Sequence, residues 1–351
     1  MPTKIEWTRN ADGSQGESWN PIRARNKATG KQGHYCQRIS PGCTHCYAAA
    51  MNIWRGNGVD YTVPGLDEVE LYLDKKVLMQ PLGWRKPRNI FVCSMTDLFA
   101  EFVPEEWIAQ VYAVEALCAR HTFMHLTKRP ERRQSFLTRF ENAGEWAQYL
   151  SFLADEDGVL WEAKAKCHIT NAINGVLAEG CNVGWPMKNV REGVSVCTQK
   201  EADDLIPVLL ATPASCRFVS AEPLLEAINL DCLTRRVWVG FEEFTAPMNA
   251  LYQGFADHLD WVICGFESGR KARFVESAVE IARSLRDQCA ATGVPFFFKQ
   301  WGLWLPPGQR GSYGDALGTF ENGTCKPMRL TKKTAGALLD GVEYREFPKA
   351  A

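Results

Sequence analysis

Short runs of apolar, β-branched and aromatic residues recur along this chain of 351 residues, and most are followed by a segment with helical character. Strands that are apolar along their whole length, rather than at alternate positions, are typical of a parallel sheet buried on both faces. The alternation of strand and helix therefore predicts an α/β fold. Six runs carry this prediction, at residues 89–93, 122–126, 193–197, 217–220, 261–264 and 295–298.

A further strand near 19–23 brings the total to about seven strand–helix units, which favours an open or partial barrel over a closed eightfold one. Helices are expected at 104–119, 130–140, 201–211 and 274–291, with Pro104 in the first turn of its helix, and a short one at 331–339. We expect a main domain over 1–303 and a C-terminal extension over 304–351. Three long insertions interrupt the repeating pattern, at about 56–88, 141–190 and 230–260.

The composition, 46% hydrophobic and 23% charged, is that of an ordinary globular protein. No apolar run reaches the roughly 20 residues that span a bilayer, and the N-terminus lacks the apolar core of a signal peptide. We therefore expect a cytoplasmic protein with no membrane partner. Thirteen cysteines in a reducing compartment do not indicate a disulfide framework. The net charge of −1 gives no overall attraction to nucleic acid.

Three of the cysteines, Cys36, Cys43 and Cys46, stand close together in the sequence. Three thiolates are one fewer than a closed structural metal site needs, and a site with three protein ligands keeps a position open for chemistry. Pro41 and Gly42 permit the turn that brings the sulfurs together. The spacing alone leaves three alternatives open: an iron–sulfur cluster, a zinc knuckle with His34 or His45 as fourth ligand, and unligated thiols.

Polar residues follow the expected strands, and the carboxyl ends of parallel strands form the active-site face of such folds. Carboxylates there can accept hydrogen bonds from ribose hydroxyls or an ammonium group, and the cations can hold a carboxylate or phosphate. We expect cofactor contacts from Ser94, Asp97, Thr127, Lys128, Ser195, Glu222, Gly265, Glu267 and Ser268. Substrate contacts are expected from Arg129, Lys299, Gln300 and Trp301, the last as a stacking surface.

Lys128, Arg129, Arg132 and Arg133 form the densest basic cluster of the sequence. It is interpreted either as a solvated helix start or as a contact to nucleic-acid phosphates.

Seven ordered motifs resemble the phage Gp37/Gp68 family, a group similar to radical S-adenosylmethionine (SAM) enzymes. The motifs are Trp19-Asn-Pro21, the cysteine motif Cys36-x6-Cys43-x2-Cys46, Ser94-Met-Thr-Asp-Leu-Phe99, Leu126-Thr-Lys-Arg-Pro130, Ser220-Ala-Glu-Pro-Leu-Leu225, Glu267-Ser-Gly269 and Phe298-Lys-Gln-Trp-Gly302. The resemblance implies a partial (β/α)6-type radical SAM barrel. It also implies a [4Fe-4S] cluster on the three cysteines, with SAM on the remaining iron, and a flavodoxin- or ferredoxin-like one-electron reductant.

The resemblance further implies an enzyme that cleaves SAM reductively and uses the 5′-deoxyadenosyl radical to modify or rearrange a substrate. The expected substrate is a hypermodified thymine in phage DNA, changed by an isomerase- or aminomutase-like reaction in the host cytoplasm. A free nucleotide or a peptide is the alternative substrate, and a zinc-stabilised nucleic-acid-binding module is the alternative without catalysis. The chain departs from the family pattern at Phe266, where a glycine is usual, and from most radical SAM enzymes in the six-residue first gap.

Overall fold

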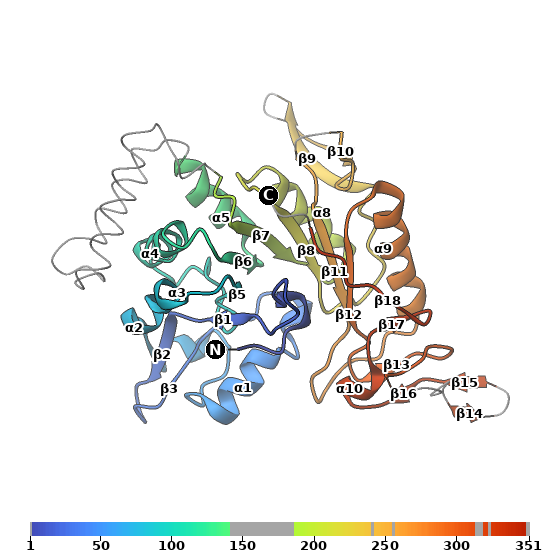
Figure 1. Cartoon of the computed structure of the whole chain (residues 1–351), viewed down its shortest axis with the longest axis horizontal. Helices are drawn as coiled ribbons and strands as arrows, with labels where there is room; N and C mark the ends of the chain where they lie inside the picture. Colours follow the sequence, from blue (N-terminus) through green and yellow to red (C-terminus); the bar gives the residue numbers. More distant parts are fainter. Residues whose placement is uncertain are drawn as a thin grey trace.

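A computed structural model describes residues 2–140, 186–239, 242–254, 257–312, 319–321 and 324–348. Its centre is a parallel sheet of seven strands that neighbour one another in chain order, and the sheet is curled into a half-barrel with helices along its outer face (Figure 1). The strands are β1 (Glu17–Trp19), β5 (Asn89–Val92), β6 (Thr122–Thr127), β7 (Val190–Ser195), β8 (Arg217–Ala221), β11 (Trp261–Gly265) and β12 (Phe296–Gln300). The predicted α/β fold is confirmed.

The outer helices begin and end where the local sequence allows it. In α8, the Thr198 side chain caps the helix by accepting a hydrogen bond from the Glu201 N–H. Gly293 ends α9 in the left-handed conformation, with a φ of 74°. The sequence predicted Pro104 in the first turn of α4. In the structure, Pro104 is the N-cap, directly before the first helical residue. The four helices are α4 (Glu105–Ala116), α5 (Pro130–Leu137), α8 (Gln199–Leu210) and α9 (Ala278–Thr292).

Two hydrophobic clusters lie between the sheet and these helices, and a third lies inside the half-barrel. Side chains alternate between the two faces: on β8, Phe218 belongs to the inner cluster and Val219 to an outer one. Gly193 on β7 makes room for the inner layer, because a Cβ there would overlap the Phe218 ring. The inner layer consists of Trp7, Phe91, Met124, Phe218, Trp261, Ile263 and Phe297.

The first strand of the sheet ends earlier than expected, because Asn20 and Pro21 interrupt it. The chain then enters a separate antiparallel sheet of β2 (Ile22–Asn26), β3 (Gln32–Gly33) and β4 (Val69–Leu73). The expected insertion at 56–88 contains β4 and the short helices α2 (Lys75–Leu78) and α3 (Gln80–Gly83), after the 3-10 turn η3 (Pro64–Leu66). The insertion at 230–260 contains the hairpin of β9 (Leu233–Val239) and β10 (Glu242–Met248). The insertion at 141–190 lies outside the described residues, apart from 186–190.

The C-terminal part packs on the edge strand β12. The Phe298 N–H donates to the Tyr344 carbonyl at 3.0 Å, and Leu305 and Leu339 join an outer core cluster. The helix expected at 331–339 is shorter, since Gly336 ends α10 (Lys332–Ala335). Short strand pairs follow one another here: β13 (Trp304–Leu305) with β16 (Met328–Arg329), β14 (Thr319–Glu321) with β15 (Thr324–Lys326), and β17 (Leu338–Leu339) with β18 (Val342–Glu343).

No helix among the described residues is long and apolar enough to cross a membrane.

Candidate functional site

A pocket of about 270 Å³ lies at the carboxyl ends of the parallel strands. Most of the residues singled out from the sequence line it, although they come from seven separate segments of the chain. The structure therefore brings together side chains that the sequence could only place at separate strand ends. The lining includes Cys36, Cys43, Cys46, Ser94, Asp97, Thr127, Lys128, Ser195, Glu222, Glu267, Ser268, Lys299 and Gln300.

The pocket also has an apolar side that sequence reasoning missed. Ile5 and Trp7 come from the N-terminal segment, around the 3-10 turn η1 (Glu6–Thr8), and line the pocket together with Phe91 and Leu126. The Trp7 ring lies 4.8 Å from that of Phe91 and is 2% exposed. A single tryptophan near a chain end gives no periodic signal that would have marked it.

The cysteine loop is held in place by its own backbone and by an ion pair. The Ser40 side chain accepts a hydrogen bond from the Gly42 N–H at the start of the 3-10 turn η2 (Pro41–Cys43). The Arg38 guanidinium donates to the Cys43 carbonyl at 3.2 Å and pairs with Asp60 at 2.6 Å. Cys46 is the N-cap of helix α1 (Tyr47–Arg55). The loop is therefore ordered by groups other than its thiols.

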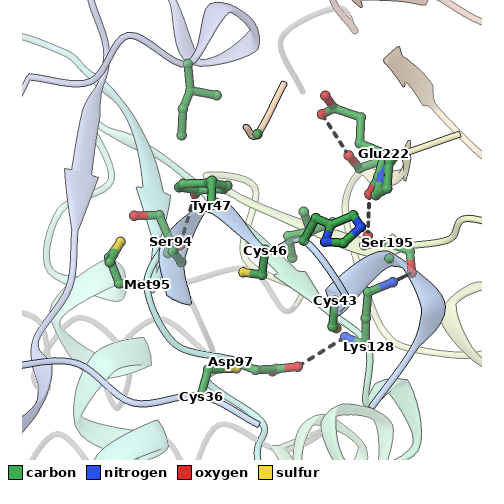
Figure 2. A pocket seen from close by; sticks show the side chains of 18 of the residues that line it. Cys36, Cys43, Cys46, Tyr47, Ser94, Met95, Asp97, Lys128, Ser195 and Glu222 are labelled. Carbon is green, nitrogen blue, oxygen red and sulfur yellow. Dashed lines mark hydrogen bonds between the residues drawn. The ribbon is translucent and has the colours of Figure 1, made fainter. Parts of the chain in front are cut away.

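The three thiols line the same pocket, and in the view of Figure 2 Cys36 lies at Asp97, Cys43 lies towards Lys128, and Cys46 lies between them. None of them forms a disulfide, and each is partly exposed. Burial raises the pKa of the Cys36 thiol to about 12, and it raises the pKa of Cys46 as well. Both are therefore neutral thiols until a metal displaces their protons.

Among the residues that the structure describes, no three His, Cys, Asp or Glu side chains are arranged to hold a single metal ion. His34 does not line the pocket, and it donates from Nδ1 to the Ile22 carbonyl at 3.1 Å. His45 lines the pocket. Three thiols that line one pocket but do not converge on a single ion would suit an iron–sulfur cluster held by three thiolates.

The loop after β5 lines the pocket and begins with an unusual backbone conformation. Cys93 has a φ of 53°, in the left-handed region that non-glycine residues rarely adopt. The Asn20 side chain supports the residues that follow: its oxygen accepts from the Met95 N–H at 3.0 Å, and its amide donates to Ser94 Oγ at 3.2 Å. The motif Trp19-Asn-Pro21 thus positions the motif Ser94-Met-Thr-Asp-Leu-Phe99.

Asp97 lines the pocket, but its carboxylate is fully engaged within the protein. Oδ1 accepts from Thr127 Oγ1 at 2.7 Å and from the Phe99 N–H at 3.0 Å. Oδ2 accepts from Arg129 Nη1 at 3.0 Å and from the Lys128 N–H at 3.2 Å. Four donors fill the acceptor positions of a carboxylate. Asp97 therefore joins the loops after β5 and β6, rather than offering a free acceptor for a ligand.

Glu222 and Lys299 form an ion pair in the pocket, 2.8 Å apart, with side chains that are 14% and 16% exposed. Ser220 Oγ donates to the same carboxylate at 3.2 Å, and Ser195 Oγ donates to the Glu222 carbonyl at 3.2 Å. Gly265 does not line the pocket, but a Cβ there would come 2.7 Å from Glu222 Oε1. Its role is to give room to that carboxylate.

Glu267 is also paired, with Arg273 six residues later. The Arg273 N–H donates to Glu267 Oε2 at 2.7 Å, and its guanidinium donates to the Pro41 carbonyl at 3.0 Å. The loop after β11 is thereby bound to the cysteine loop. The three carboxylates of the pocket, Asp97, Glu222 and Glu267, are thus each neutralised by a cation of the protein.

Lys128 lines the pocket near Ser195 and Cys197. Its ammonium group donates to the Ser195 carbonyl at 3.0 Å and lies 3.6 Å from Cys197 Sγ. Glu201 is its nearest carboxylate, at 3.7 Å.

Two expected substrate contacts do not face the pocket. Trp301 is 1% exposed, its indole N–H donates to the Leu338 carbonyl at 2.8 Å, and its ring stacks on Phe266. The ring is part of the core and leaves no free face for a substrate. Arg129 is 6% exposed and paired with Asp97 and Glu101.

The basic cluster is neither a solvated helix start nor a free phosphate-binding surface. Arg133 is completely buried and paired with Glu192 at 3.3 Å, and Arg132 donates to the carbonyls of Ala100 and Val103. These partners are distant in the sequence, so the pattern of charges did not reveal them.

Comparison with known families identifies the family of this chain. Residues 2–348 match the family described as protein of unknown function (DUF5131). The chain belongs to this family. No curated protein and no solved structure matches it.

Proposed function

We propose that this member of the family is a radical SAM enzyme, with a [4Fe-4S] cluster on Cys36, Cys43 and Cys46 and SAM in the adjoining pocket. The observation that supports this most is the place of the three thiols: they line one pocket at the carboxyl ends of parallel strands. When bound, the cluster and SAM supply a 5′-deoxyadenosyl radical that removes a hydrogen atom from a carbon of the substrate.

The residues of the chain would bind and orient SAM and the substrate, and they would exclude water. The amino-acid part of SAM is a zwitterion, which suits a pocket whose carboxylates are already paired and whose side wall carries the Lys128 ammonium group. The ion pair of Asp97 and Arg129 holds the loops after β5 and β6 together. Ile5, Trp7 and Phe91 provide an apolar surface that keeps water from a reactive radical.

For the substrate, we propose a hypermodified thymine in DNA, rearranged in an isomerase-type reaction, and a flavodoxin- or ferredoxin-like protein as reductant. This proposal rests on the resemblance of the motifs. A duplex does not fit into a pocket of about 270 Å³ at the strand ends, so the base has to be flipped out of the helix. The arginines at 129–133 are internally paired, so contacts to the DNA backbone have to come from other residues.

Anaerobic purification followed by reconstitution with iron and sulfide tests the cofactor. We expect about four irons per chain and release of 5′-deoxyadenosine from SAM with a chemical reductant. Substituting alanine for Cys36, Cys43 or Cys46 should abolish both. Cys232→Ala is the matched control, because Cys232 is an exposed thiol outside the pocket. A protein that holds one zinc and does not cleave SAM would support the zinc-stabilised module instead.

The substrate is tested separately, by mass spectrometry of nucleosides from DNA of cells with and without the gene. A changed thymine derivative that depends on Cys43 supports the DNA proposal. Unchanged DNA together with 5′-deoxyadenosine formation would point to a free nucleotide or a peptide.

A further inference from the structure

A second cavity, of about 550 Å³, lies at the opposite end of the parallel sheet. Its lining includes residues at the amino ends of five neighbouring strands, from β6 to β12. The inner aromatic layer around Trp261 and Phe218 lies between this cavity and the pocket at the carboxyl ends. The strand-end residues are Thr122, Asn189, Cys216, Asp260 and Pro295.

The charges of this cavity are unbalanced. Arg120, Lys188 and Arg191 contribute three cations, and Asp260 is the one carboxylate among its lining residues. Asp260 is already engaged, since Oδ2 accepts from the Arg217 N–H at 2.7 Å and Oδ1 lies 3.5 Å from His258 Nε2. The lining therefore carries an excess of positive charge.

Arg191 is the central cation. It lies on β7 between Val190 and Glu192, whose side chains face the outer helices, so its own side chain faces the inside of the sheet. It is half-buried, and within the described ranges no carboxylate forms an ion pair with Arg191 or with Lys188. A guanidinium group that is half-buried without a counter-charge is suited to bind an anion bidentately.

His121 also lines the cavity, but its ring nitrogens are not available to a ligand there. The side chain is 1% exposed and interacts through Nε2 with the Pro81 carbonyl at 3.2 Å. A carbonyl only accepts, so Nε2 carries the proton. Nδ1 is buried away from solvent. The polar contacts to a ligand therefore have to come from the cations.

We propose that this cavity binds a small phosphate ester, with Arg191 and Lys188 on the phosphate. A small ester fits better than a nucleic-acid duplex, because the cations line a concave site at the strand ends. The proposal does not depend on the function proposed for the cysteine pocket.

Isothermal titration calorimetry of the full chain at low ionic strength tests it, with inorganic phosphate, pyrophosphate and ribose 5-phosphate as probes. We expect saturable binding of the phosphate group to one site. Arg191→Gln should weaken binding by about tenfold or more, because it removes a charge-assisted contact. Arg270→Gln is the matched control, since Arg270 is exposed and lies outside this cavity.

Unchanged thermal unfolding of Arg191→Gln without ligand separates a binding defect from a folding defect. No saturable binding of any of the three probes, or equal effects of Arg191→Gln and Arg270→Gln, would overturn the proposal. Binding of a short DNA duplex that Arg191→Gln weakens, without binding of the small probes, would also overturn it, in favour of a nucleic-acid backbone. Iron content and SAM cleavage should be the same in Arg191→Gln and the unchanged protein.

Discussion

Gly42 and Cys197 lie against each other where the cysteine loop meets the carboxyl end of β7. A Cβ on residue 42 would overlap the Cys197 sulfur and come 3.2 Å from Pro223 Cδ. Gly42 is thus required by a close approach as well as by the turn that the sequence predicted. The contact holds the cysteine loop against the residues that follow β7 and β8.

This contact predicts that Gly42→Ala is destabilising and that Cys197→Ala restores stability. The added methyl overpacks a tight contact, which costs about 1–3 kcal/mol, and removal of the sulfur opens the space again. Urea unfolding of the two single variants and the double variant measures the effect, and iron content after reconstitution shows whether the loop has moved. If the double variant were no more stable than Gly42→Ala, the overlap would not be what fixes the loop.

The strands were predictable because each buried strand of a parallel sheet is a continuous apolar run. Some strand starts were misplaced. β1 begins at Glu17 and not near 19. β7 begins at Val190 and not at 193, because Arg191 and Glu192 interrupt the apolar run. Both charges have tertiary reasons: Glu192 accepts from the Tyr112 hydroxyl at 2.7 Å, and Arg191 lines the second cavity.

The strand-end residues of the site were predictable for the same topological reason, but their roles were not. Whether a carboxylate is free or paired depends on partners far away in the chain, as for Asp97 with Arg129 and Glu222 with Lys299. Trp301 has the residue type of a stacking surface, yet its neighbours Phe266 and Phe298 bury it. Composition and spacing do not contain this information.

The Arg133–Glu192 pair predicts a large loss of stability for Arg133→Met. Both side chains are almost completely buried, and the variant leaves the Glu192 carboxylate in the core with the Tyr112 hydroxyl as its remaining hydrogen-bond partner among the described residues. Breaking a buried pair on one side costs about 3–5 kcal/mol. Chemical unfolding measures it, and Arg133→Met with Glu192→Gln should lose clearly less. A loss below about 1 kcal/mol, the range of exposed pairs, would contradict the buried position of this pair.

The pair of Glu222 and Lys299 predicts coupling between the two positions. Lys299→Met leaves the carboxylate with the Ser220 hydroxyl, and Glu222→Gln leaves the ammonium group without a counter-charge. We expect a coupling free energy of about 1–3 kcal/mol in a double-mutant cycle. Lys200 and Asp204 form an exposed pair on α8 and serve as the control cycle. In this control cycle the coupling free energy should stay below about 0.5 kcal/mol. Equal coupling free energies in the two cycles would show that the pocket does not shield its ion pair from solvent.

His121 predicts a specific acid sensitivity of folding. Burial lowers the pKa of His121 below its ordinary value of 6.5, and the nearby Arg120 and Arg88 act in the same direction. The unfolded chain therefore binds a proton that the folded protein does not, so stability is complete above about pH 6.5 and falls as the pH is lowered. His121→Gln keeps an N–H for the Pro81 carbonyl but does not titrate. Its free energy of unfolding should decrease less between about pH 7 and pH 5 than that of the unchanged protein, whatever its absolute stability. Parallel curves for the two proteins would mean that His121 is protonated equally in the folded and unfolded states.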